Sequence, residues 1–130
     1  MHRLTLSSPR QQSRSYSPVV VTTGGRTIWL SGIIAAEDED GISLENDFDG
    51  QVRCIFRKMS ETLSRVGANL SDVVSMTVFI TRVSDNNRFV ELRKEVFEES
   101  FPTSTLVTVA ALNSPEYLIE ITAVAVASEP

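Results

Sequence analysis

The spacing of apolar residues changes several times along the chain, and each change predicts a new element. Runs with the β-branched and apolar composition of strands occupy 3–6, 19–22, 27–30 and 73–81. Two segments instead repeat their apolar residues every three or four positions, as one face of a helix does. The first helical stripe contains Val52, Ile55, Phe56, Met59, Leu63 and Val66, and the second contains Phe89, Leu92, Val96 and Phe97. Two further strands are expected within 102–127, on either side of a turn at 113–115.

Turn and cap residues mark the ends of these elements. Gly24 and Gly25 separate the runs at 19–22 and 27–30, and such a pair predicts a tight hairpin between them. Gly67 follows the first stripe and is expected to end that helix as a C-cap. The polar segment 7–15 is expected to be a surface loop.

The resulting order of elements predicts an α+β fold, with a mixed six-stranded sheet and two helices on one face. With 130 residues and 42% hydrophobic residues, the chain is expected to form a single domain over residues 1–130. The sheet face away from the helices still carries many Val, Ile, Leu and Ala side chains. A homo-oligomer that buries this face is therefore expected.

Charge and composition narrow the function classes. The net charge of −5 and the pI near 4.8 argue against nucleic acid and anionic membrane surfaces as partners. The first 18 residues lack the apolar core of a secretory leader, so a cytoplasmic location is expected. The single Cys54 permits no internal disulfide, and the single histidine, His2, lies at the terminus. No metal site and no cofactor are expected.

Glu120 is the most conspicuous polar residue of the C-terminal strands. It interrupts an apolar run and, by strand alternation, shares a face with Leu118, Thr122, Val124 and Val126. An ionised carboxylate in such a strand is costly unless a donor or water meets it. Glu120 is therefore either a water- or ligand-holding group or a structural hydrogen-bond anchor.

Several short motifs, taken together and in this order, resemble the YjgF/RidA family. They are Tyr16-Ser17, Leu30-Ser31-Gly32, the strand 73–79, and the stretch from Phe101-Pro102 to Ala125 that contains Ile119-Glu120-Ile121. The resemblance covers residues 13–127, so residues 1–12 precede it as a short strand and loop. It implies a chorismate-mutase-like fold, a homotrimer whose sheets line a barrel, and a small-molecule cleft at each subunit interface.

The resemblance also implies roles for individual residues. Active members hydrolyse 2-imino or enamino acids, using a glutamate that holds water, a tyrosine that closes the pocket and a glycine beside the cleft. These positions correspond to Glu120, Tyr16 and Gly32. The family's carboxylate-binding arginine corresponds to Ser104, which cannot neutralise a carboxylate, so the chain resembles arginine-lacking branches of the family.

Two neighbours of Ser104 complete the expected site. Thr105 and Ser104 offer hydroxyls to a polar ligand, although hydroxyls in strands are commonplace, and Leu106 indicates a modified pocket. Arg14, beside Tyr16, is a candidate source of the missing positive charge. The simpler interpretation of Arg14 is an exposed, solvated arginine, and that of Tyr16 is a packed loop aromatic whose hydroxyl has a hydrogen-bond partner.

Two functions remain open from the sequence. One is a RidA-like enzyme, or degenerate enzyme, that deaminates an imine-type metabolite with Glu120 steering water. The other is a binding module that holds a small metabolite without turnover. An endoribonuclease or translation inhibitor is the least expected, because the chain is acidic and lacks a basic aromatic surface.

Overall fold

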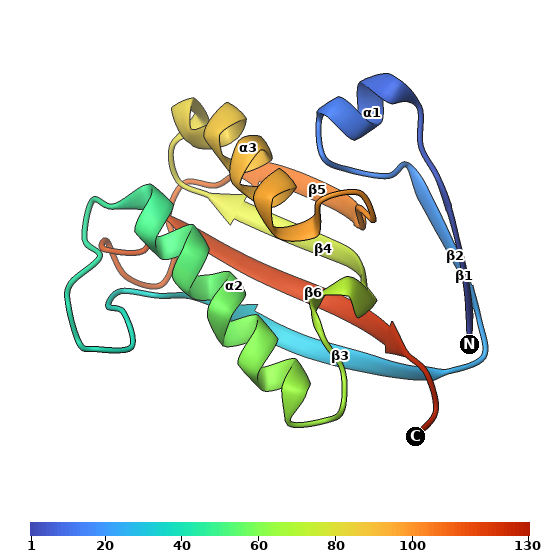
Figure 1. Ribbon diagram of the computed structural model, residues 1–130. Coiled ribbons are helices and arrows are strands. Elements are labelled where there is room, and N and C mark those ends of the chain that lie inside the picture. The colour runs from blue at the N-terminus through green and yellow to red at the C-terminus, as the bar shows by residue number, and fades with distance from the viewer.

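The computed structural model describes residues 1–130 as one sheet covered by helices, with a separate strand pair beside it (Figure 1). Its elements are β1 (His2–Leu6), α1 (Pro9–Ser13), β2 (Val19–Thr23), β3 (Arg26–Ile33), α2 (Phe48–Ser64), β4 (Val73–Ile80), α3 (Asn86–Phe97), β5 (Thr103–Thr108) and β6 (Ile119–Ala127). Short 3₁₀ turns lie at Leu70–Asp72 and Val83–Asp85. The predicted α+β class is confirmed.

The main sheet has four strands in the order β3-β6-β4-β5. β4 runs parallel to β5 and antiparallel to β6, so the sheet is mixed, and β4 is an interior strand. β1 and β2 form their own antiparallel pair. The prediction of one six-stranded sheet was wrong in this respect: six strands are present, but they divide into sheets of two and four.

The predicted hairpin across Gly24 and Gly25 was also wrong. Both glycines have positive φ, 72° and 82°, as a tight turn requires. However, β2 pairs with β1, and β3 pairs with β6. β3 packs Ile28 and Leu30 against the core, whereas the side chains of β2 are largely exposed, so burial directs β3 to the main sheet.

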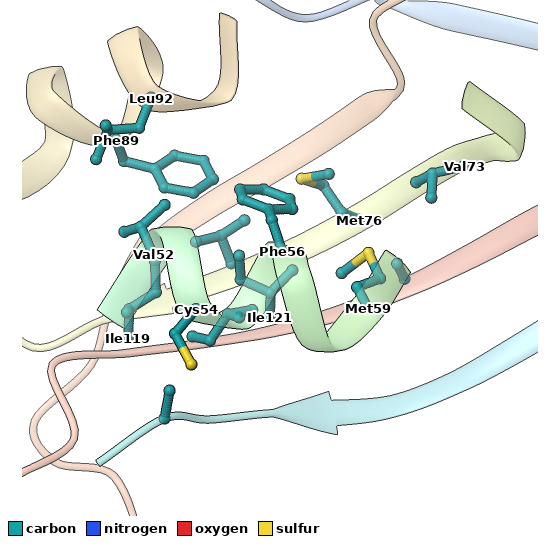
Figure 2. Close-up of a cluster of buried hydrophobic side chains, with 14 of the residues drawn as sticks. Val52, Cys54, Phe56, Met59, Val73, Met76, Phe89, Leu92, Ile119 and Ile121 are labelled. Atoms are coloured by element: carbon teal, nitrogen blue, oxygen red, sulfur yellow. The ribbon is translucent and has the colours of Figure 1, made fainter. Parts of the chain in front are cut away.

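Both long helices cover the same face of the four-stranded sheet, as predicted, and the core lies between them and the strands (Figure 2). The stripe on α2 is buried except for Val66, which lies beyond the helix and is exposed. Asp47 caps the helix by accepting a bond from the backbone N–H of Gly50, and Gly67 follows its end with φ of 74°. Core residues labelled in Figure 2 come from α2 (Val52, Cys54, Phe56, Met59), β4 (Val73, Met76), α3 (Phe89, Leu92) and β6 (Ile119, Ile121).

The opposite face of the sheet, called here the open face, is not covered by the chain. Along β6, Ile119, Ile121 and Ala123 are buried toward the helices, while Glu120, Thr122 and Val124 are partly exposed. The alternation predicted for this strand is therefore confirmed over 119–124, whereas Leu118 and Val126, which were expected on the face of Glu120, are buried. The open face also carries Trp29 on β3, which is paired with Val124 and is 78% exposed.

The segment 7–15 is more ordered than the predicted surface loop. Ser8 begins the short helix α1 with a capping box, in which its hydroxyl accepts from Gln11 N and Gln11 Oε1 accepts from Ser8 N. Pro9 occupies the first helical turn, where its missing N–H costs nothing. The signal was present in the sequence as Ser-Pro-x-Gln.

Among all helices of the structure, none has the length and apolar character needed to cross a bilayer.

Candidate functional site

The loop that carries Tyr16 is held in place by two fully buried serines. Ser15 Oγ donates to the carbonyl of Val90 on α3 at 2.7 Å, and its backbone has a positive φ of 60°. Ser17 Oγ donates to Phe101 O at 2.6 Å, and Ser17 N donates to Pro102 O at 3.0 Å. Such a sparsely populated backbone persists only where surrounding contacts hold it. Tyr16, half-buried between the two serines, is thereby fixed beside α3 and β5.

A buried arginine from α3 lies next to this loop. Arg93 is 3% exposed, and its guanidinium lies 5.2 Å from the centroid of the Phe89 ring. Three of its N–H groups are engaged: Nε donates to Ser15 Oγ at 3.0 Å, Nη2 to Arg14 O at 2.9 Å, and Nη1 to Ser104 Oγ at 2.6 Å. The residue expected to replace the family's arginine is thus itself bonded to an arginine.

The positive charge of Arg93 has no negative partner in the chain. Every ion pair in the structure involves other arginines, namely Arg53, Arg57, Arg82 and Arg88. Burial, and after it the charge of Arg14, lowers the pKa of Arg93 to about 10, so the side chain remains charged at neutral pH. A buried guanidinium without a carboxylate is an electrostatically costly arrangement.

These residues surround a small pocket at the edge of the sheet. It is lined by Arg14, Tyr16, Asn86, Val90, Arg93, Ser104 and Leu106, and its volume is about 170 Å³. β5 is one of the two edge strands of the four-stranded sheet, so the pocket lies where the sheet ends. The pocket therefore combines two guanidinium groups, a phenol and apolar side chains.

Glu120 and Gly32 form a second group of predicted residues, on the open face. A Cβ on residue 32 would overlap Oε2 of Glu120, because the backbone of β3 runs directly beside the carboxylate. The β3–β6 pairing is also irregular between Leu30 and Ile33. The Glu120 side chain makes no ion pair and no hydrogen bond within the chain, so the interpretation as a structural anchor has no support from these contacts.

Strand register separates Ser104 from Glu120. Ser104 pairs with Met76, which is buried under the helices, so both side chains face the helices. Glu120 pairs with Phe79, three residues further along β4, and faces the opposite way. Within one chain the two residues cannot contribute to the same pocket.

The predicted site residues therefore fall into two half-sites. Tyr16, Ser104 and Leu106 lie in the pocket with Arg14, which is exposed and donates to Asn87 Oδ1 at 3.3 Å. Gly32 and Glu120 lie on the open face. Thr105 faces the same side, because it pairs with Thr77, and Thr77 in turn pairs with Thr122 of β6.

Sequence reasoning missed Arg93, although a signal was present. Phe89, Arg93 and Phe97 are four residues apart, which puts the arginine on the buried stripe of α3. A lone charge at such a position is rarely accidental, because charges are almost never fully buried without a partner.

No cluster of three or more His, Cys, Asp or Glu side chains in the structure is arranged to hold a metal ion.

Fold and site together define a small α+β protein with a cationic pocket at a sheet edge and an unpaired carboxylate on the open face. The model of the family described as endoribonuclease L-PSP matches residues 6–127. The chain therefore belongs to the YjgF/RidA (endoribonuclease L-PSP) family, which the sequence motifs had indicated.

Related proteins from distant organisms support this assignment. The human 2-iminobutanoate/2-iminopropanoate deaminase is 32% identical over 111 residues, covering 85% of this chain and 79% of the human protein. A RutC family protein of Pyrococcus abyssi is 32% identical over 101 residues, covering 78% of this chain and 79% of its own.

Solved structures share the fold. A Rid family protein of unknown function from Yersinia pestis, YyfB, matches with a TM-score of 0.85 over 98% of this chain and 100% of its own, at 23% identity. RidA from an Antarctic Psychrobacter matches with a TM-score of 0.71 and 27% identity, covering 87% of this chain and 89% of its own.

Proposed function

We propose that this protein is a RidA-type hydrolase that deaminates a small imine or enamine metabolite, in clefts formed between the subunits of a homotrimer. Water adds across the C=N bond of the imine to give a carbinolamine, which expels ammonia and leaves a carbonyl group. Glu120 takes the proton of the attacking water and returns it to the departing nitrogen, a general acid/base role. The family membership and the human deaminase relative support this reaction class.

The observation that carries the proposal is the unpaired Glu120 carboxylate beside Gly32. A partly exposed acid with no hydrogen-bond donor in its own chain is available to hold water. The Glu120 side chain points to the same face of the sheet as Trp29, whose exposed ring is expected to pack against a second copy.

The division into two half-sites supports the placement of the cleft between subunits. The pocket of Tyr16 and Ser104 lies at the free edge of β5, and Glu120 lies on the other face of the sheet. A neighbouring subunit whose open face meets this edge brings its own Glu120 toward the pocket. The trimer thus completes a site that one chain lacks.

Ammonia release tests the proposal. 2-Iminopropanoate and its longer homologues are generated in place by an amino-acid oxidase, and release is compared for wild type, Glu120→Ala and the matched surface variant Glu61→Gln. Wild type and Glu61→Gln are expected to accelerate release, while Glu120→Ala loses about 10²- to 10⁴-fold.

Two results would change the assignment. Full activity in Glu120→Ala would remove the carboxylate from the mechanism. Saturable binding of the corresponding 2-oxo acids without any acceleration by wild type would instead identify the module that holds a metabolite without turnover.

A further inference from the structure

Arg93 is buried and held by three hydrogen bonds, which leave part of its guanidinium without a partner. The group has five N–H donors, and three are engaged by Ser15, Ser104 and the carbonyl of Arg14. All three partners are neutral oxygens. Two donors remain for a further acceptor, on a group that also lines the pocket.

The energetics favour an anion as that acceptor. A buried charge is normally compensated by a partner of opposite sign, and Arg93 has none in its own chain. The charge of Arg14, which also lines the pocket, is positive too and lowers the pKa of Arg93 further. An anion in the pocket is attracted by both groups and relieves the repulsion between them.

The other walls indicate which anion fits. Val90 and Leu106 are apolar, and Tyr16 presents an aromatic ring with one hydroxyl. The volume of about 170 Å³ lies below the roughly 300–1,000 Å³ typical of sites for drug-sized ligands. A planar carboxylate with a short carbon chain satisfies both the fork of the guanidinium and the apolar walls.

We infer that Arg93 binds the carboxylate of a small 2-imino or 2-oxo acid, so that the positive charge reaches the pocket from α3 instead of from residue 104 on β5. Ser104 then serves as a positioning residue, whose hydroxyl accepts from Nη1 and orients the guanidinium. The reaction class rests on the proposed function, but the carboxylate site stands on the contacts of Arg93 itself.

A purely structural role for Arg93 is the competing explanation, because its three bonds also tie the Tyr16 loop to α3 and β5. The two roles differ in what the ligand must carry. A structural arginine would affect all ligands equally, whereas a carboxylate-binding arginine distinguishes a carboxylate from its neutral amide.

The test therefore compares 2-oxobutanoate with 2-oxobutanamide by titration calorimetry, using wild type, Arg93→Gln and Lys94→Gln. Lys94 is the exposed neighbour on the same helix, and its variant removes the same charge outside the pocket. Wild type and Lys94→Gln are expected to prefer the carboxylate by about 10- to 100-fold, and Arg93→Gln is expected to lose this preference.

A second measurement needs no stable variant. The ¹⁵N resonance of the buried Arg93 Nε–H in the wild type, assigned by side-chain correlation with the backbone, is expected to shift on addition of 2-oxobutanoate and not of the amide. Equal binding of acid and amide by wild type, or an unchanged preference in Arg93→Gln, would overturn the inference.

The outcomes separate this inference from the proposed reaction. Binding of 2-oxobutanoate that depends on Arg93, without turnover of any imino acid, would keep the carboxylate site and remove the deaminase function. Turnover that Arg93→Gln leaves unchanged would keep the deaminase and remove the role of Arg93.

Discussion

The backbone at Gly32 lies directly against the carboxylate of Glu120, so closely that a Cβ on residue 32 would overlap Oε2. Cδ and Cγ of Glu120 would also lie only 3.0 and 3.2 Å from that Cβ. Glycine can be needed either for a left-handed backbone or for close approach, and the φ of Gly32 is not in the left-handed region. Glycine is therefore required here because the backbone approaches the carboxylate so closely. The glycine therefore determines where the carboxylate can lie.

Gly32→Ala is expected to displace Glu120 and to lower the proposed deaminase activity to the level of Glu120→Ala. The overlapping atoms belong mainly to the end of a flexible side chain, so the free energy of unfolding should fall by only about 1 kcal/mol. Urea unfolding and kcat/KM are measured for both variants, for the double variant and for the exposed Thr27→Ala on the same strand. Any activity loss in the double variant well beyond that of Glu120→Ala would contradict this relationship.

Ser104→Arg is expected to destabilise the protein instead of adding a useful second guanidinium to the pocket. Ser104 Oγ lies 2.6 Å from Arg93 Nη1, so a second guanidinium there would meet a buried like charge. The cost should be about 1–3 kcal/mol in the free energy of unfolding, measured with urea. Adding Arg93→Gln to Ser104→Arg should recover most of this loss, and the absence of such recovery would show that the two positions do not compete for one charge.

Trp29→Glu is expected to dissociate the proposed trimer, because it places a charge on the open face where the exposed Trp29 ring is proposed to pack against a second copy. Sedimentation velocity should show a change from trimer to monomer. Trp29 is the only tryptophan and is 78% exposed in the single chain, so the wild-type emission should shift to the red when the oligomer is diluted apart. Val83→Glu, at an exposed position in the turn before α3, serves as the control. A monomeric wild type would reject the trimer.

Glu39→Gln is expected to lower stability at neutral pH but not in strong acid. Arg57 donates from Nε and Nη2 at 2.7 and 3.0 Å, and these bonds, with one from Cys54, lower the pKa of Glu39 from 4.5 to about 2. A depressed folded-state pKa stabilises the protein above the unfolded value, and this contribution disappears as the pH falls from 4.5 toward about 2.

Urea unfolding at several pH values between about 7 and 2 checks this linkage. The difference between wild type and Glu39→Gln should shrink across the acid window. Glu37→Gln, which removes an exposed carboxylate that makes no ion pair, serves as the control for the loss of one negative charge. A constant difference at all pH values would mean that the ionisation of Glu39 is not linked to folding.

The local patterns of the sequence determined most elements and the faces they present. The apolar stripe of α2 and the alternation along β6 both follow from the period of the side chains, which depends only on neighbouring residues. The motifs around Tyr16, Gly32 and Glu120 likewise identified the family without a structure.

Tertiary structure alone decided which segments meet. β2 pairs with β1 instead of with its neighbour β3, and of the two strands only β3 packs apolar side chains against the core. Arg93 meets Ser104 and the loop at Ser15, and register puts Ser104 and Glu120 on opposite faces. Which strands pair, and which charges come together, depends on burial between segments far apart in the chain. The local spacing of apolar residues carries no information about such contacts.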